Sequence, residues 1–356
     1  MPHASPETTT LANTTISGSL AARAASLARP VSSWRSWARA WRRSSDDAID
    51  PSRTGPRIAV LGNCQAEGVA QSLCLLLPQA RVELVPFDGL GRRYGTLERL
   101  KAHLAPFDHV FTQFFSEGFI RGGNAHALGE GDPRLRLYPT ILFPGYQPDM
   151  VLVGDVGALS AARLVASPVG PYHSAIVLCA YLEGRGPRET AELFRDTTYA
   201  QLGFYEAWNV AAAELLGTAG DLGFPLESEL ARWSRRGCFM HVLNHPKLFV
   251  LADIARRLAT EAGLNPSPAS VEDYLPDDLA TGAVWPLYPD LAARYGLTGT
   301  MLFKDRGRRG GPKLYDLPTF IAASFAIYRR HPPEALGCLR VEGWRANPAV
   351  RALFRV

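Results

Sequence analysis

The chain of 356 residues contains no run of about 18 apolar residues, so the sequence predicts no membrane-spanning helix. Its first residues lack a basic stretch followed by an apolar core, and we therefore expect no secretory signal. Only five cysteines occur, widely spaced and without a C-x-x-C pair. This usage predicts reduced thiols in a cytosolic protein rather than a disulfide framework or a zinc site.

A strong excess of charge is also absent, because 38 Lys and Arg against 34 Asp and Glu give a net charge of +4. This excess is too small for a nucleic-acid-binding surface, so we expect no nucleic-acid partner. No P-loop, G-x-G-x-x-G or G-x-S-x-G pattern is present. A hydrophobic content of 47% is typical of a globular protein with a sizeable core.

Residues 1–55 are rich in Ala, Ser, Thr and Arg, and we expect them to form a mostly disordered tail. Within this tail, Trp34, Trp37 and Trp41 are spaced i, i+3, i+7 among arginines. The spacing favours a short amphipathic helix on an anionic membrane surface. A helix docked on its own domain and an unstructured tail are the alternatives. We therefore expect a cytoplasmic location, with peripheral membrane contact through the three tryptophans as a hypothesis.

Strand-like and helix-like patterns alternate in the next part of the chain. Strands are predicted at 57–63, 81–87, 109–115 and 140–144, and helices at 66–77 and 96–104. This alternation predicts a parallel α/β sheet. Helical patterns then dominate, at 173–184, 187–196, 204–219, 226–237 and 247–264. We expect one α/β domain over residues 56–356, sheet-rich at 56–169, with a helix-rich part at 170–356 packed on the sheet.

The turn Gly-Asn-Cys-Gln at 62–65 follows the first predicted strand. Ligands bind at the carboxyl ends of parallel strands, so this turn is a candidate site. Gly62 would permit an unusual backbone angle, and the amides of residues 64–66 would attract an anion or oxyanion. The same field would lower the pKa of Cys64 and favour its thiolate. The alternative is a small buried thiol that packs the corner.

Two further segments contain candidate histidines. His173 and Ser174 fall at a predicted helix start, where serine is an ordinary cap and a neutral histidine is available as a base. The alternative is a cap followed by a half-buried ring. His241 and His245 are four residues apart, but Pro246 interrupts the helix that a shared metal site would need. We therefore expect no metal, and one of the two histidines in a pocket.

A glycine-rich basic loop near the C-terminus includes Lys304, Arg306 and Arg308. Arginine and lysine donate charge-assisted hydrogen bonds to phosphate, so this loop is a candidate contact for a phosphorylated cofactor. A solvated surface loop is the alternative.

Six separated motifs occur in order between about residues 57 and 304: "VLGNCQAEGVAQSL", "DHVFTQ", "FPGYQPDM", "GPYHSAIVLCAYLEG", "FMHVLNHPKLFVLADIA" and "WPLYPDLAARYGLTGTMLFK". With these motifs the sequence resembles the WcbI family of bacterial polysaccharide biosynthesis enzymes. The resemblance implies an α/β fold and a capsule or surface-polysaccharide enzyme that binds coenzyme A or acetyl-CoA and O-acetylates a sugar. It carries over the turn residues Gly62 to Gln65, together with Gln113, His173, Ser174 and residues 244–247. Gln147 departs from the histidine expected of the family, so a base at that position would be lost.

Our first hypothesis is direct acetyl transfer from acetyl-CoA to a sugar hydroxyl, with His173 as base and Asn63 and Gln65 as oxyanion donors. In a variant, Cys64 carries the acyl group. An esterase or hydrolase at the same turn, and a non-catalytic membrane-associated assembly factor, are the alternatives. The candidate catalytic residues are His173, Cys64, Ser174 and His245, and the candidate cofactor-binding residues are Gly62, Asn63, Gln65, Gln113, Lys247, Lys304, Arg306 and Arg308.

Overall fold

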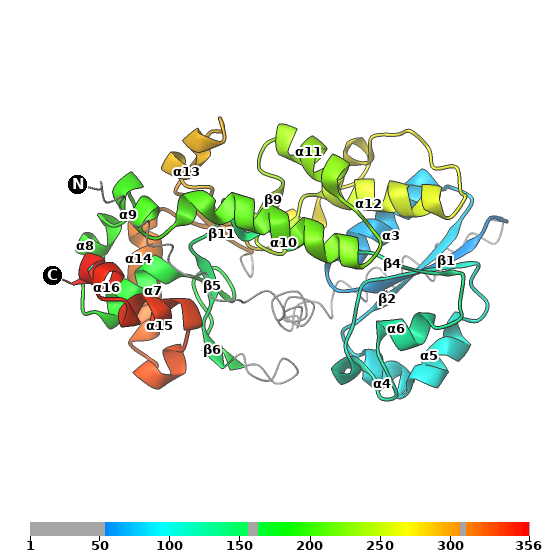
Figure 1. The fold of residues 1–356 in the computed structure, drawn as a ribbon, viewed down its shortest axis with the longest axis horizontal. Coiled ribbons are helices and arrows are strands. Elements are labelled where there is room, and N and C mark those ends of the chain that lie inside the picture. Colours follow the sequence, from blue (N-terminus) through cyan, green and yellow to red (C-terminus); the bar gives the residue numbers. More distant parts are fainter. Residues whose placement is uncertain (1–53, 156–162, 307–310, 356) are drawn as a thin grey trace, which may run out of the picture.

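The computed structural model describes residues 54–155, 163–306 and 311–355 (Figure 1). A four-stranded parallel sheet forms its N-terminal part, in the order β2-β1-β3-β4. The strands are β1 (Arg57–Gly62), β2 (Arg81–Pro86), β3 (His109–Thr112) and β4 (Leu135–Leu137). The predicted α/β class with a parallel sheet is confirmed.

Strand β1 lies at the centre of the sheet and is buried on both faces, which explains its continuous apolar sequence. Ile58 and Val60 contribute to a large hydrophobic core, whereas Ala59 and Leu61 contribute to a smaller one. Helices α3 (Gln65–Leu76) and α12 (Leu248–Glu261) belong to the large core, and α4 (Leu90–Tyr94), α5 (Leu97–Leu104) and α6 (Ala125–Gly129) to the small one. The sheet therefore lies between two layers of helices (Figure 1).

The predicted fourth strand at 140–144 is wrong, because the fourth strand is β4. The backbone in the predicted stretch bonds elsewhere. The amide of Ile141 donates to Gln65 Oε1 at 2.9 Å, and the amide of Phe143 donates to the Leu243 carbonyl at 2.7 Å. An apolar run cannot reveal that a buried glutamine side chain takes the place of a neighbouring strand.

The remainder of the chain is rich in helices, as predicted. The helices are α7 (Ala175–Leu182), α8 (Pro187–Ala191), α9 (Asp196–Gln201), α10 (Ala207–Asp221), α11 (Glu227–Arg235), α13 (Pro289–Arg294), α14 (Leu317–Tyr328), α15 (Leu339–Ala346) and α16 (Pro348–Phe354). Figure 1 shows α7, α8 and α14 to α16 at the end of the molecule far from the sheet, with α10 running between the two ends.

Four antiparallel strand pairs that the sequence patterns did not predict accompany these helices. They are β5 (Met150–Leu152) with β8 (Tyr172–Ser174), β6 (Gly154–Asp155) with β7 (Arg163–Leu164), β9 (Met240–Val242) with β10 (His245–Pro246), and β11 (Phe303–Asp305) with β12 (Lys313–Tyr315). The strands have only two or three residues each, too few to show a clear alternation in the sequence.

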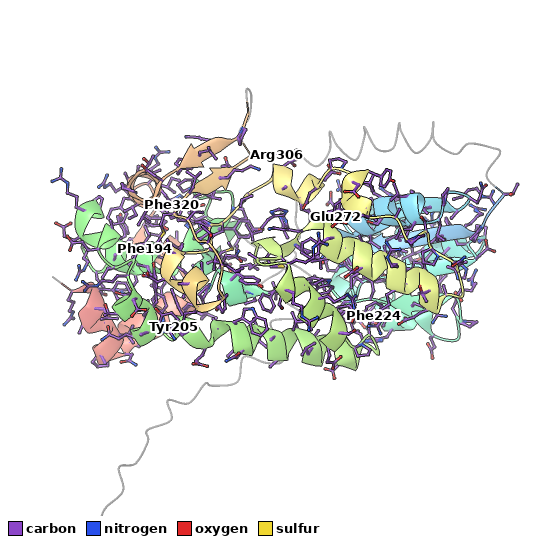
Figure 2. All side chains as sticks on the ribbon, turned by 90° about the horizontal axis from the view of Figure 1, so that it is seen from above. Phe194, Tyr205, Phe224, Glu272, Arg306 and Phe320 are labelled. Atoms are coloured by element: carbon purple, nitrogen blue, oxygen red, sulfur yellow. The ribbon has the colours of Figure 1, made fainter. Side chains whose placement is uncertain are left out.

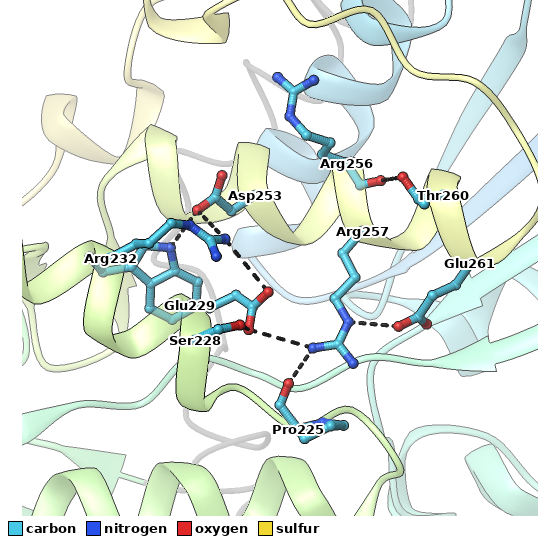
Figure 3. Close-up of polar contacts among 10 residues, drawn as sticks. Pro225, Ser228, Glu229, Arg232, Asp253, Arg256, Arg257, Thr260 and Glu261 are labelled. Atoms are coloured by element: carbon cyan, nitrogen blue, oxygen red, sulfur yellow. Dashed lines mark hydrogen bonds and ion pairs between the residues drawn. The ribbon is translucent and has the colours of Figure 1, made fainter.

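Polar contacts fix α12 against α11 (Figure 3). Asp253 accepts a hydrogen bond from Trp233 Nε1 at 2.9 Å and pairs with Arg232 at 3.2 Å. On its other side α12 packs closely on α3, because a Cβ at Gly68 would lie 2.5 Å from Leu251 Cδ1. The start of α12 is thereby held near the start of α3.

Some predictions concern residues outside the described ranges. The tail with Trp34, Trp37 and Trp41 lies there, and so does Arg308, so the hypotheses about them stay predictions. Within the described ranges, none of the helices combines the length and the apolar character that a membrane crossing requires.

Candidate functional site

Strand β1 lies between β2 and β3 in the sheet. The turn at its carboxyl end is therefore at the point where the strand order changes direction. Such a switch point is where ligands bind in doubly wound sheets. Asn63 organises the turn: its Oδ1 accepts from the Gln65 amide at 2.9 Å and its carbonyl accepts from the Ala66 amide at 3.1 Å. The expectation that these two amides are free to bind an anion is therefore wrong.

Glycine is required at position 62 because neighbouring side chains lie close to its Cα. Its φ is not positive, so the predicted unusual backbone angle is wrong. A Cβ at this position would lie 2.5 Å from Gln113 Oε1 and 3.0 Å from the Tyr138 hydroxyl. Gln113 Oε1 also accepts from the Asn63 amide at 2.8 Å, so the absence of a side chain at Gly62 lets Gln113 hold the turn.

Gln65 is buried and fully hydrogen-bonded. Its Nε2 donates to the carbonyls of Ile141 at 2.8 Å and Asn244 at 2.9 Å. Its Oε1 accepts from the Ile141 amide at 2.9 Å, with Gln113 Nε2 at 3.4 Å. Gln65 thus ties α3 to two later segments of the chain, and its amide has no remaining group for a ligand. We call Asn63, Gln65, Gln113 and their partners the turn network.

A pocket of about 100 Å³ lies beside this network, between α3, the start of α12 and residues 276–282. The lining residues at the start of α3 are Cys64, Glu67, Gly68 and Gln71, whose spacing of three, four and seven places them on one helical face. His245 and Arg306 also belong to the lining. The volume is below the roughly 300 Å³ at which sites for drug-sized ligands begin, so this pocket by itself does not enclose a ligand of that size.

Cys64 caps α3 and is 8% exposed. Burial raises the pKa of its thiol to about 12, although the backbone amides of residues 64 and 65 act in the opposite direction. Desolvation of the charged form is larger here than the effect of the helix start. The predicted low-pKa thiolate is therefore wrong, and Cys64 is a protonated thiol at neutral pH.

His245 begins β10 and its ring contacts the ring of Tyr172 edge-on, with 6.4 Å between centroids. Its Nδ1 is shielded from solvent and has no hydrogen-bond partner within the described chain. This atom faces Gly282, where an added Cβ would lie 3.9 Å from it. Burial, with a contribution from His241, lowers the pKa of His245 to about 4. The ring is therefore neutral at pH 7.

Asp277 fixes the pocket wall formed by residues 276–282. His241 Nε2 lies 2.8 Å from Asp277 Oδ2, which also accepts from the Leu248 amide at 3.0 Å. Burial acts to raise the pKa of Asp277, but these hydrogen bonds and that of the Ala280 amide hold it below its ordinary value. His241 is thus paired with a carboxylate, and within the described ranges no group of three or more candidate ligands is arranged to hold a metal.

Three acidic residues of the pocket, Glu67, Asp277 and Asp278, were not predicted. Burial and the negative charge of Asp278 raise the pKa of Glu67 to about 6. Gln71 Nε2 donates to Asp278 Oδ2 at 3.0 Å and so links α3 to the η5 turn (Asp278–Thr281). The helical spacing from Cys64 could have identified Glu67 and Gln71. No local pattern could have identified Asp278, which reaches the pocket only through tertiary packing.

His173 and Ser174 lie outside the pocket lining, in the core. His173 Nδ1 lies 3.0 Å from the Tyr328 hydroxyl, and Nε2 lies 2.9 Å from the Val165 carbonyl. Ser174 accepts from the Val177 amide at 3.0 Å and caps α7. Both ring nitrogens of His173 are occupied, so the structure favours the structural alternative for this pair.

Of the predicted cationic residues that the structure describes, one lines the pocket and two lie outside its lining. Arg306 directly follows β11 and lines the pocket, and Figure 2 shows it at the end of the β11–β12 hairpin. Lys304 donates to the Ala280 carbonyl and supports the pocket wall from outside the lining. Lys247 precedes α12 and is not part of the lining. Gln147 is buried elsewhere, so its departure from the expected histidine removes no base from this pocket.

The fold and the pocket define an α/β protein with a candidate ligand site near the carboxyl edge of its parallel sheet. A family model described as the polysaccharide biosynthesis enzyme WcbI matches residues 57–267, more than half of the chain. The chain therefore belongs to the WcbI family of polysaccharide biosynthesis enzymes, which confirms the resemblance found in the sequence.

A solved structure of WcbI supports the fold. It is described as the native protein without a disulfide bond between coenzyme A and a cysteine. The match has a TM-score of 0.57 at 18% sequence identity, and covers 84% of this chain and 98% of that one. A search of curated proteins found no match.

Proposed function

We propose that this protein transfers an acyl group from a coenzyme A thioester to a sugar hydroxyl during polysaccharide biosynthesis. The observation that carries the proposal is the neutral His245, whose Nδ1 has no partner within the described chain, in the lining of the same pocket as Cys64. The description of the solved WcbI structure names coenzyme A together with a cysteine. Cys64 is the one cysteine among the described residues that line the pocket here.

The size of the pocket agrees with a thioester end. About 100 Å³ accommodates the acyl group and the sulfur of the cofactor, but not its nucleotide. The nucleotide then lies outside the pocket, and Arg306 is the lining residue that we assign to a phosphate, because guanidinium groups bind phosphate with charge-assisted hydrogen bonds.

In the reaction that we propose, His245 takes the proton of the acceptor hydroxyl as the hydroxyl oxygen attacks the thioester carbonyl carbon. The resulting tetrahedral intermediate expels the coenzyme A thiolate, and protonated His245 returns the proton to that sulfur. The carbon-sulfur bond breaks, the ester carbon-oxygen bond forms, and free coenzyme A leaves. His245 replaces His173 as the proposed base because both nitrogens of His173 are occupied.

Cys64 has no covalent role in this scheme. A thiol with a pKa of about 12 carries almost no thiolate at neutral pH, and the thiolate is the nucleophilic form. Mass spectrometry after rapid quenching with acetyl-CoA tests the point. Direct transfer predicts no acetyl group on Cys64, whereas a retained acetyl group supports the carrier variant.

Calorimetric titration with coenzyme A tests the proposed function. Wild type should bind it, and Arg306→Ala should bind it about tenfold more weakly through loss of a phosphate contact. The matched control is Arg329→Ala, which removes an exposed arginine outside the pocket lining and should bind like wild type. Absence of binding by wild type, or equal loss in both variants, contradicts the proposal. Consumption of acetyl-CoA at full rate without a sugar supports a hydrolase instead.

A further inference from the structure

We propose that the sugar acylated in this pocket is uncharged, that Glu67 and Asp278 hold its hydroxyl groups, and that sugars carrying a carboxylate are excluded. The inference rests on the proposed function, because it describes the acceptor of that same reaction. It goes further by assigning the acceptor a chemical class and the pocket two specificity-determining residues.

The first support is the charge of the pocket. Among the described residues that line it, three carry carboxyl groups, Glu67, Asp277 and Asp278, and one carries a guanidinium, Arg306. Asp277 is committed to His241 and the Leu248 amide. Glu67 and Asp278 are therefore the two carboxyl groups that remain to face a ligand beside Cys64.

The second support is the position of Glu67 in the pocket lining near the negative charge of Asp278. Glu67 is half-buried in the pocket lining, and burial together with the negative charge of Asp278 disfavours its ionised form. A buried carboxylate is stabilised by hydrogen-bond donors, and sugar hydroxyls are such donors. A carboxylate from an acidic sugar would instead add a further like charge to the same small volume.

The third support is the position of the two residues relative to the proposed chemistry. Glu67 lies three residues after Cys64 on the same face of α3, and Gln71 holds Asp278 at 3.0 Å from the next turn of that face. The Nδ1 of His245 has no partner within the described chain and faces Gly282 of the same lining. The two carboxyl groups that would accept hydrogen bonds from the sugar hydroxyls thus line the same pocket as the proposed base.

Arg306 is the group that would favour an anion. It follows β11 at the end of the hairpin, and we assign it to the cofactor phosphate (Figure 2). With the cofactor bound, its charge is neutralised and the remaining charge around the acceptor is negative. Discrimination against acidic sugars is therefore a property of the cofactor-bound protein.

The test measures transfer from acetyl-CoA to methyl glucoside and to methyl glucuronoside. The glucuronoside has a carboxylate where the glucoside has a hydroxymethyl group. We expect kcat/KM for the glucoside to exceed that for the glucuronoside by about tenfold or more. In Glu67→Gln and Asp278→Asn, that ratio should fall at least about threefold, mainly through KM of the glycosides. Glu334→Gln, which removes an exposed carboxylate outside the lining, is the matched control and should keep the wild-type ratio.

Coenzyme A calorimetry on the same proteins distinguishes failure of the inference from failure of the proposed function. If coenzyme A binds and the glucuronoside reacts as well as the glucoside, the inference is overturned and the proposed function stands. The inference is likewise overturned if both variants keep the wild-type ratio, or if coenzyme A binds and neither glycoside reacts. If coenzyme A does not bind at all, the proposed function fails, and the inference fails with it.

Discussion

The regions around His173 and His245 differ in the hydrogen-bond partners of the two rings. Burial lowers the pKa of both histidines to about 4. His173, however, has both ring nitrogens bonded to Tyr328 and Val165, whereas His245 has an Nδ1 without a partner in the described chain and lines a pocket. A lowered pKa by itself reports only burial, and the unpartnered atom beside a cavity is what identifies a candidate for chemistry.

The same contrast separates the turn network from the pocket. Gln65 is fully hydrogen-bonded and connects three segments, while Glu67, two residues later, lines the pocket, where burial and the charge of Asp278 raise its pKa. The turn that follows β1 thus contributes a structural framework on one side and part of the pocket lining on the other. Substitutions on the two sides should therefore affect different measurements.

The largest effect on stability is expected for Gln65→Ala. It leaves the amide and carbonyl of Ile141 and the carbonyl of Asn244 without partners. Each buried unpaired group costs about 1–3 kcal/mol, so the free energy of unfolding should fall by about 3–5 kcal/mol, measured by urea denaturation. The control Gln71→Ala removes one hydrogen bond at the pocket and should cost about 1 kcal/mol or less. Equal losses would show that the turn network has no special structural role.

The pH dependence of stability should be the next largest effect, and it concerns both histidines. Each has an ordinary pKa of 6.5 and a folded-state pKa of about 4. Between these values the unfolded chain binds a proton that the folded chain does not, so stability is full above pH 6.5 and falls as the pH drops towards 4. For the fully buried His173 this amounts to about 3 kcal/mol.

His173→Gln tests this linkage, since it removes the titrating ring while retaining hydrogen-bonding groups. The slope of unfolding free energy against pH between 4 and 6.5 should decrease by one proton. An unchanged slope would mean that His173 is accessible to protons in the folded state, contrary to its burial.

The sequence predicted the parallel sheet well because β1 and α3 have local signatures: a continuous apolar run, a glycine turn and a helical repeat ending at Pro78. It placed Cys64, His245 and Arg306 among the candidates, and all three line the pocket. It could not show which candidates have hydrogen-bond partners, because these partners are distant in the chain. Those of Gln65, for example, are 76 and 179 residues away.

Two physical effects explain the remaining errors. The helix start at Cys64 does lower the thiol pKa, but desolvation is the larger effect, and the sequence does not show how deeply the turn is buried. Asp277 and Asp278 come from a segment without regular periodicity that reaches the pocket through tertiary contacts, made by Asp277 with His241 and α12 and by Asp278 with Gln71.

The smallest effect is expected for Cys64→Ala. Direct transfer predicts that this variant keeps acyl-transfer activity within about fivefold of wild type, because the thiol forms no bond with the acyl group. Steady-state release of coenzyme A in the presence of a sugar acceptor measures it. A loss of about a thousandfold would instead identify Cys64 as the acyl carrier.

The central claim is that His245, and not His173, acts on the acceptor hydroxyl. The most direct measurement is the single-turnover rate of acetyl transfer in His245→Ala and His173→Gln, each corrected for the folded fraction determined by circular dichroism. We predict a loss of about a hundredfold or more for His245→Ala and less than about fivefold for His173→Gln. The reverse order, or equal losses, would contradict the assignment of this pocket as the active site.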